Sequence, residues 1–252
     1  MKNIFYILAF IILSLSGGES RALAGDWIKL ESGIHYRSFS PDLPDNSDNK
    51  AAYIHAFRIN PQKYEIRPIY DAGKRSSATM MLEEKKALVV VNANFFDPAG
   101  KPLGLVVQNK KILNPFKNIS WWGLLRIEDD WLSIIHSSEY SPKDLPFAAV
   151  QAGPRLIVNK TIPKLKDEFR QRTAVGITKK GELIILSVLK PMKLTELASL
   201  MLLPEKKGGL ECIQALNLDG GSSTQMAAHI GDFELKLPSY ISVPVGLGVF
   251  RK

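Results

Sequence analysis

Hydrophobic residues in this chain occur mainly in short runs that alternate with polar positions, a pattern typical of β-strands with one buried face. The runs lie at residues 52–59, 64–70, 87–96, 103–113, 122–135, 147–160, 173–189, 211–218 and 242–250. The letters NPQK, which favour a turn, separate the first two runs, and the pattern therefore predicts a β-hairpin there.

Two segments have the spacing of helices instead. SSATMMLEEKK, residues 76–86, predicts a helix with Ser76 or Ser77 as its N-cap. LTELASLMLL, residues 194–203, predicts a second helix capped by Thr195. Many short strands and two helices predict an α+β fold, a single domain with a large, mainly antiparallel sheet and a few helices.

The first 24 residues have the composition of a secretory signal peptide. Lys2 precedes an uncharged apolar run, and Ala22 and Ala24 fit an A-x-A cleavage site. The run is shorter than the roughly 20 residues of a spanning helix, so we expect removal and no stable membrane insertion afterwards. An uncleaved anchor is the alternative. The sequence thus predicts an exported protein, periplasmic or secreted, with a signal peptide (residues 1–24), an N-terminal segment with a polar loop (25–50) and one domain (51–252).

Composition and charge narrow the choice of partners. A chain of 252 residues that is 45% hydrophobic is long enough for a sizeable core, and its single cysteine, Cys212, excludes an intramolecular disulfide.

Much of the formal net charge of +8 sits in lysine pairs beside predicted turns. A solvated surface is the simplest interpretation, and a surface that favours anionic polymers is the alternative. No basic stripe is interleaved with aromatic residues, so we expect no nucleic-acid partner.

Several common catalytic motifs are missing from the sequence. It has no Gly-rich phosphate loop, no H-E-x-x-H and no C-x-x-C, and the serines of DGGSS lack the G-x-S-x-G pattern. We expect structural roles for the four histidines, which makes a Ser-His-Asp hydrolase or a histidine-rich zinc site a poor explanation.

Four groups of polar residues stand where apolar runs begin or end. Polar groups at core depth are costly unless they are paired, so each group is either a satisfied turn or part of a site. Turn chemistry alone is the simplest explanation of Asp-Gly-Gly taken by itself. The groups are Asn92, Asn94 and Asp97 in VVVNANFFD; Gln151 and Arg155 in AVQAGPRLI; Arg170, Arg172 and Thr173 in RQRTAVGI; and Asn217, Asp219, Ser222, Ser223 and Thr224 in ALNLDGGSST.

NANFFD, QAGPRLI, RTAVGI and LNLDGGSSTQM, in this order and at these spacings, resemble the phosphodiester glycosidase family. The similarity covers roughly residues 51–249, and LTELASLML also resembles a helix that this family carries before its Asp-Gly-Gly strand. The sequence departs from the family pattern at two places: Ser222 replaces a third glycine, and Ala93-Asn94 stand where glycines often do. These departures bear on the identity of the substrate more than on the class of reaction.

The resemblance implies a catalytic role for Asp219. We expect a second carboxylate and choose Asp97, with Glu65, Asp71 and Glu182 as alternatives. The implied substrate-binding residues are Asn92, Asn94, Gly153, Arg155, Arg172, Thr173, Asn217, Gly220, Gly221, Ser222 and Ser223.

The residue types suit that chemistry. Carboxylates stabilise an oxocarbenium-like transition state or activate water, and arginines bind phosphate oxygens in pairs. The implied protein is an exported hydrolase that cleaves the glycosidic bond of a small-molecule or glycan sugar-1-phosphodiester. The sequence requires no cofactor, although Asp97 and Asp219 would suit a divalent cation. Two alternatives remain: a non-catalytic glycan- or cell-wall-binding domain, and a phosphodiesterase that breaks the P–O bond.

Overall fold

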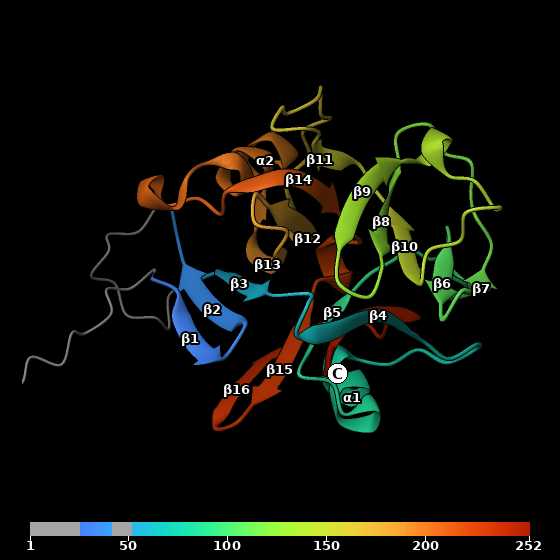
Figure 1. Ribbon diagram of the computed structural model, residues 1–252, viewed down its shortest axis with the longest axis horizontal. Coiled ribbons are helices and arrows are strands. Elements are labelled where there is room, and N and C mark those ends of the chain that lie inside the picture. Colours follow the sequence, from blue (N-terminus) through green and yellow to red (C-terminus); the bar gives the residue numbers. More distant parts are fainter. Residues whose placement is uncertain (1–25, 42–51) are drawn as a thin grey trace, which may run out of the picture.

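The computed structural model describes residues 26–41 and 52–252, which form three antiparallel sheets and two α-helices (Figure 1). The predicted signal peptide, residues 1–24, lies outside the described residues, as does the polar loop from residue 42 onward. The prediction of mainly antiparallel pairing is confirmed. The single large sheet is wrong, because the strands divide into one sheet of seven and two sheets of five.

The seven-stranded sheet has the order β1-β2-β3-β13-β12-β14-β11. Its central strands β12 and β13 are buried along most of their length, since the core covers one face and α2 covers the other. The strands are β1 (Ile28–Glu31), β2 (Ile34–Phe39), β3 (Ile54–Ile59), β13 (Leu183–Met192), β12 (Arg170–Thr178), β14 (Cys212–Asn217) and β11 (Arg155–Ile157).

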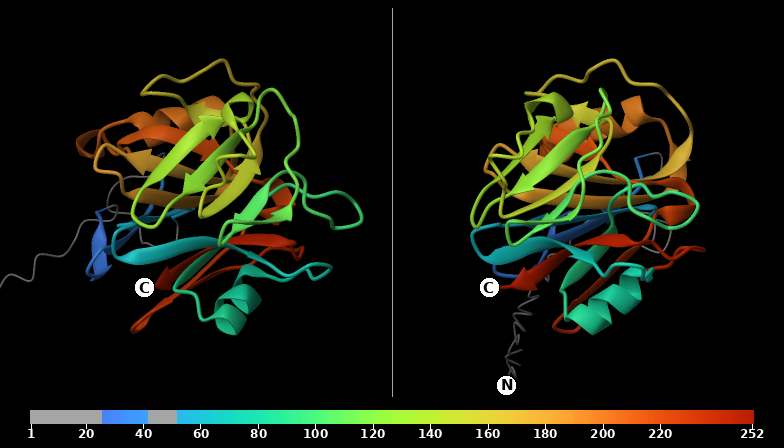
Figure 2. Two further views of the ribbon diagram at one scale, coloured as in Figure 1. Left: turned by 45° about the vertical axis from the view of Figure 1, so that its right-hand side comes forward. Right: turned by 90° about the vertical axis from the view of Figure 1, so that its right-hand side faces the viewer.

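The two five-stranded sheets lie beside each other against the larger sheet (Figure 2). One has the order β7-β6-β10-β8-β9, and the other has the order β16-β15-β5-β17-β4. Their strands are β7 (Lys111–Asn114), β6 (Val106–Gln108), β10 (Ala148–Ala152), β8 (Gly123–Ile127), β9 (Leu132–His136), β16 (Phe233–Leu237), β15 (Met226–Ile230), β5 (Val89–Asn92), β17 (Val245–Arg251) and β4 (Tyr64–Tyr70).

The hairpin predicted from the first two apolar runs does not form, although both strands do. β3 pairs with β2 and β13, whereas β4 pairs with β17 in a different sheet. The intervening turn is bonded to the β1–β2 turn, because the Asn60 amide donates to the Gly33 carbonyl at 2.9 Å. The turn therefore carries the chain between sheets, and alternation alone could not distinguish this corner from a hairpin.

One hydrophobic core joins the three sheets. It collects Val175 and Leu216 from the seven-stranded sheet, Val150 from the second sheet, and Val91 and Leu247 from the third. Each of these side chains is fully buried. Apolar burial of this kind is the main favourable term in folding, so the three sheets stabilise one another.

The two predicted helices are confirmed, with one correction to their caps. Ser77 caps α1, since its Oγ accepts a hydrogen bond from the Met80 amide at 3.2 Å. Thr195 does not cap α2, because it is the second helical residue and Lys193 is the N-cap. In the part of the chain that the structure describes, no helix is long and apolar enough to cross a membrane. The helices are α1 (Ala78–Lys85), α2 (Leu194–Leu202) and three short 3₁₀ turns, Ser137–Glu139, Glu205–Lys207 and Gly221–Ser223.

The packing of α2 predicts a large stability effect at Leu197, which is fully buried against the seven-stranded sheet. Leu197→Ala should lower the free energy of unfolding by about 2–5 kcal/mol, because it removes apolar contacts and leaves a cavity. Ile112→Ala is the control, since Ile112 is 47% exposed and a surface change should cost less than about 0.5 kcal/mol. Urea unfolding measures both; equal effects would contradict this account of the packing.

Candidate functional site

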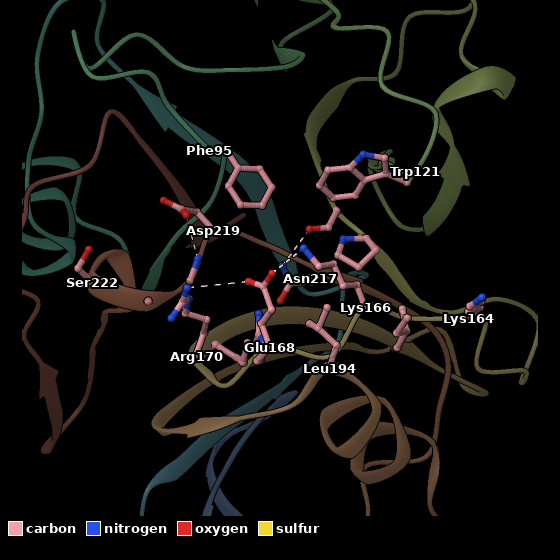
Figure 3. A pocket seen from close by; sticks show the side chains of 16 residues that line it. Phe95, Trp121, Lys164, Lys166, Glu168, Arg170, Leu194, Asn217, Asp219 and Ser222 are labelled. Atoms are coloured by element: carbon pink, nitrogen blue, oxygen red, sulfur yellow. Dashed lines mark hydrogen bonds and ion pairs between the residues drawn. The ribbon is translucent and has the colours of Figure 1, made fainter.

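A cavity of about 890 Å³ opens where the seven-stranded sheet meets loops from the other two sheets (Figure 3). One wall follows β14, a second is formed by residues 164–172, and a third comes from the loop after β5 and the turn before β8. The lining residues are Phe95, Trp121, Gly153, Pro154, Lys164, Leu165, Lys166, Glu168, Arg170, Arg172, Leu194, Asn217, Asp219, Gly220, Gly221 and Ser222.

Asp219 is held at the cavity by its own backbone. Its amide donates to the Ala93 carbonyl at 2.9 Å, and its carbonyl accepts a hydrogen bond from Asn92 Nδ2 at 2.6 Å. Its carboxylate accepts a bond from the Gly220 amide at 2.9 Å. Figure 3 shows the side chain beside Phe95 and above Arg170. Both peptide groups are thus fixed from β5 and its following loop, which orients the carboxylate.

Asn92 and Thr173, expected to bind substrate, lie behind the cavity wall. The Thr173 hydroxyl donates to Asn92 Oδ1 at 2.7 Å, and the Gln225 amide donates to the same oxygen at 3.2 Å. Asn92 and Thr173 are 1% and 0% exposed, and neither lines the cavity. Asn92 bonds the Asp219 carbonyl and Thr173 bonds Asn92, so the two residues position Asp219 without lining the cavity.

Asn94 has a comparable structural role. Its Nδ2 donates to the carbonyls of Leu103, Leu105 and Gln151 at 3.3, 3.3 and 3.0 Å. Asn94 is buried and does not line the cavity. These bonds join the loop after β5 to β10, which holds the neighbouring Phe95 at the cavity.

Asn217 and Gly153 do line the cavity. Asn217 Nδ2 donates to the Gly153 carbonyl at 2.9 Å, linking β14 to the turn between β10 and β11. Gly153 precedes Pro154 through a cis peptide bond. A Cβ at Gly153 would lie 2.7 Å from Trp122 Cδ1, so only glycine lets this turn pack against the aromatic side chain.

The local backbone requires glycine at both positions after Asp219, and both glycines also line the cavity. A Cβ at Gly220 would lie 2.7 Å from the Gln171 carbonyl of β12, and Gly221 has φ of +60°, a conformation that favours glycine. Both line the cavity, together with Ser222. Ser223 is buried, and its hydroxyl bonds the Asp219 carboxylate.

The environment of Asp219 favours its protonated form. Burial raises the pKa of Asp219 to about 6, although hydrogen bonds from Ser223 and Gly220 oppose the shift. Removing a carboxylate from water disfavours its charge, and here that effect exceeds the stabilisation by the two donors. Asp219 therefore exchanges a proton close to neutral pH.

Residues 162–169, called the strap below, connect β11 to β12 along one side of the cavity. The Asp167 carboxylate accepts bonds from the Thr195 amide at 3.1 Å and from the Thr195 hydroxyl at 2.8 Å, which ties the strap to the start of α2. Arg172 is buried and donates from Nε to the Met192 carbonyl at 3.0 Å and from Nη2 to the Glu168 carbonyl. Burial lowers the pKa of Arg172.

The strap brings a second carboxylate to the cavity, that of Glu168. It lies between Lys166, at 2.9 Å, and Arg170, at 4.0 Å (Figure 3). The hydrogen bond and the positive charge of Lys166 lower the pKa of Glu168. The cavity thus contains one carboxylate with a raised pKa and one with a lowered pKa.

Two expected site residues lie elsewhere. Asp97 sits in a turn, where its carboxylate accepts the Lys101 amide at 2.9 Å, and it does not line the cavity. The Arg155 stem packs over Gly123, and its guanidinium faces Glu139 at 3.9 Å. The alternative carboxylates are also absent from the cavity lining: Glu65 pairs with Arg67, Asp71 with Lys85, and Glu182 accepts a bond from Thr178.

Sequence reasoning missed Glu168, Lys166, Phe95 and Trp121 as cavity residues. The alternating charges of KLKDEFRQR offered a signal for the strap, since the residues at every second position from 164 to 172 line the cavity. No local pattern distinguishes Trp121 from an ordinary exposed aromatic residue. Among residues 26–41 and 52–252, no group of three or more His, Cys, Asp or Glu side chains is arranged to hold a metal ion.

Comparison with known proteins supports one family. A model of the phosphodiester glycosidase family matches residues 85–250. Comparison with curated proteins finds no match.

Solved structures that share the fold include the following three proteins. The catalytic domain of zebrafish N-acetylglucosamine-1-phosphodiester alpha-N-acetylglucosaminidase, auto-inhibited by its pro-peptide, has 16% identity and a TM-score of 0.65, over 88% of this chain and 85% of that one. A hypothetical protein from Synechocystis has 14% identity and a TM-score of 0.59, over 87% of this chain. The chain spans 62% of that protein, less than two thirds of its length. A Burkholderia pseudomallei protein described as exported has 11% identity and a TM-score of 0.53, over 78% of this chain and 73% of that one.

The raised pKa of Asp219 predicts how Asp219→Asn changes stability with pH. The folded state binds this proton more tightly than the unfolded state, so stability falls as pH rises from the ordinary pKa of 3.8 to about 6. The neutral amide lacks this penalty, which is of order 2 kcal/mol at neutral pH after allowance for partial exposure.

The Tm of Asp219→Asn, relative to that of the native protein, should therefore be roughly 4–8 °C higher at pH 7 than at pH 4. Thermal unfolding of both proteins at the two pH values measures the difference. A Tm difference that is independent of pH would contradict the burial of this carboxylate.

The Asp167–Thr195 contact predicts how the strap is held. Asp167→Ala should speed amide hydrogen exchange across residues 162–169, while the strands beneath keep their protection. Asp167→Asn is the matched control, because its side-chain oxygen still accepts from the Thr195 amide. Hydrogen exchange read by mass spectrometry tests this; unchanged exchange in Asp167→Ala would mean that other contacts hold the strap.

Proposed function

The chain belongs to the phosphodiester glycosidase family, and we propose that it is a hydrolase that cleaves the glycosidic bond of a sugar-1-phosphodiester. Water attacks the anomeric carbon, the bond from that carbon to the phosphate oxygen breaks, and the products are a free sugar and a phosphomonoester. The observation that carries the proposal is the pair of carboxylates in one cavity, Asp219 with a raised pKa and Glu168 with a lowered one.

The two carboxylates suit different roles. Environments that push the pKa values of two acids apart are typical of acid–base pairs in hydrolases. Glu168 stays ionised and would stabilise the positive charge that develops at the sugar ring. Asp219, with a pKa of about 6, would accept the proton of the attacking water. The leaving phosphomonoester is stable as an anion, so it needs little protonation.

The cations of the same wall would bind the phosphate. Arg170 lies beside Asp219 and Glu168, and Arg172 lines the cavity beneath the strap. Arg172 donates hydrogen bonds to the Met192 and Glu168 carbonyls, and these bonds fix the orientation of its side chain. The remaining N–H groups of its guanidinium are available to bind an anion. Arginine suits this role because its planar donors bind phosphate oxygens in pairs.

Two aromatic residues would receive the sugar. Trp121 is 55% exposed and lines the cavity, as does Phe95. Phe95 stacks on Trp122 with ring centroids 5.2 Å apart, which holds its ring in place. Aromatic faces pack against the C–H groups of sugars while hydroxyls bond polar neighbours such as Ser222.

Export is part of the proposal. The pattern of residues 1–24 supports it, as does the description of one structural neighbour as an exported protein. The mature protein would begin at Gly25 and meet its substrate outside the cytoplasm.

Asp219→Asn and Glu168→Gln should each lower kcat for a sugar-1-phosphodiester by at least about a hundredfold, because each removes one charged catalytic group. The kcat/KM of the native protein should fall as pH drops below about 6, since Asp219 then carries a proton. Quantification of free sugar and phosphomonoester across a panel of sugar-1-phosphodiesters measures both effects.

Asp97→Asn is the matched control for this assay, because Asp97 is a carboxylate of a neighbouring turn outside the cavity. It should keep kcat within about threefold of the native value. Near-normal turnover by Asp219→Asn, or a collapse of turnover in Asp97→Asn, would reverse the assignment. Saturable glycan binding without turnover in the native protein would instead support a binding domain.

A further inference from the structure

The Gln225 side chain connects the residues after Asp219 to a helix and a loop outside the cavity. It is 1% exposed, and its oxygen and its nitrogen are both bonded. Oε1 accepts a hydrogen bond at 2.6 Å from the amide of Ala78, the first residue of α1. Nε2 donates to the Ser223 carbonyl at 3.3 Å and to the Ile241 carbonyl at 3.2 Å. Because a buried polar group is costly unless it is paired, these bonds favour one position of the side chain.

The 3₁₀ turn Gly221–Ser223 depends on contacts of this kind. It has two backbone bonds of its own, at 3.2 and 3.1 Å. Two side chains bond its carbonyls from outside the turn: Gln225 bonds that of Ser223, and the Ser239 hydroxyl bonds that of Ser222. A single 3₁₀ turn has few and poorly aligned internal bonds, so the outside contacts decide where its side chains lie.

Ser223 links Gln225 to the carboxylate of Asp219. The Ser223 carbonyl accepts from Gln225, and the Ser223 hydroxyl bonds the carboxylate. Burial raises the pKa of Asp219, and the bond from Ser223 opposes that shift, because it stabilises the charged form. Gln225 itself does not line the cavity.

We propose that Gln225 is a positioning residue for Asp219: it fixes the Gly221–Ser223 turn so that the Ser223 hydroxyl stays bonded to the Asp219 carboxylate. Gln225 acts through Ser223 and touches neither the substrate nor the carboxylate. Its role in holding the carboxylate ionised stands on these contacts alone, whereas its effect on turnover rests on the proposed function.

The charged groups around Asp219 are bonded independently of Gln225. Arg170 and Arg172 reach the cavity from β12, and Glu168 and two lysines reach it from the strap (Figure 3). The loop after β5 contributes an aromatic side chain to the lining and no charged one. None of these residues bonds the Gln225 side chain, so a substitution at this position leaves their charges in place.

The proposal is tested by ¹³C NMR of protein labelled at its aspartate carboxyl carbons, which follows the titration of Asp219 without turnover. The Asp219 signal is the one that is absent from Asp219→Asn. Gln225→Met keeps the length of the side chain and removes its hydrogen bonds. The titration midpoint of Asp219 should rise by about one pH unit, the effect of one hydrogen bond to a charged group. Ser223→Ala should raise the midpoint by a similar amount, and Gln225→Met should add nothing further in that background.

Gln151→Met is the matched control. Gln151 is 0% exposed and its side chain makes four hydrogen bonds, none of them to the turn after Asp219. The control should lower the free energy of unfolding, measured with urea, and leave the Asp219 midpoint unchanged.

A second variant tests Gln225 where Gln225→Met does not fold. Ala78→Pro removes the N–H that bonds Gln225 Oε1, and proline is tolerated at the first position of a helix. The preceding residue, Ser77, has the extended conformation that proline requires, with φ of −76° and ψ of 160°. This variant should also raise the midpoint of Asp219.

The outcomes separate the positioning role from the proposed function. An unchanged midpoint in Gln225→Met, a shift of equal size in Gln151→Met, or a further shift when Gln225→Met is added to Ser223→Ala overturns the role. The expected shifts, in a protein that hydrolyses no sugar-1-phosphodiester, support the role and contradict the proposed function. In an active protein, the pH midpoint of kcat/KM should rise together with the NMR midpoint.

Discussion

The site depends on one buried amide side chain, that of Asn92. It donates to the Asp219 carbonyl and accepts from the Thr173 hydroxyl and the Gln225 amide, so it connects β5 to β12 and to the chain that follows β14. These atoms lie where two sheets meet and water does not reach. A buried donor or acceptor without a partner costs about 1–3 kcal/mol, so this set of bonds strongly favours a single arrangement. The position of the Asp219 carboxylate follows from it.

The cavity has two parts: the hydrogen-bonded residues around Asn92 and Asp219, and the irregular strap. The residues after β14 are bonded to neighbouring strands and hold Asp219 in a partly buried position, which raises its pKa. The strap has no strand partners of its own, is tied down by Asp167 and Arg172, and brings Glu168 to the cavity. The sheet framework thus supplies a carboxylate whose pKa is close to neutral pH, and the strap supplies ionised groups close to solvent.

Local pattern predicted most of the elements but not how they assemble. Alternation located β3 and β4, and spacing located both helices, because these signals depend on neighbouring residues in the chain. The turn between β3 and β4 resembles a hairpin loop in sequence, yet the two strands join different sheets. Strand pairing of this kind depends on distant partners, which the sequence of one chain does not reveal.

The same limit applies to the site. The sequence predicts that polar residues at strand ends are either paired or part of a site, and of these residues Asn217, Asp219, Gly220 and Ser222 line the cavity. Whether a buried polar side chain faces a cavity or a backbone depends on its tertiary neighbours, and Asn92, Asn94 and Thr173 face backbone or one another. Glu168 was overlooked because a charged, irregular segment looks like ordinary surface in sequence. Its approach to the cavity follows from the anchoring of the strap at α2.

Isotope labelling identifies the bond that the protein breaks in its substrate. Hydrolysis of a sugar-1-phosphodiester in water enriched in ¹⁸O, with mass analysis of the phosphorus-containing product, distinguishes attack at carbon from attack at phosphorus. Cleavage of the glycosidic bond should release a phosphomonoester that contains no ¹⁸O, together with free sugar. An ¹⁸O atom in the phosphate, or release of a sugar phosphate, would contradict it and place the chemistry at the P–O bond.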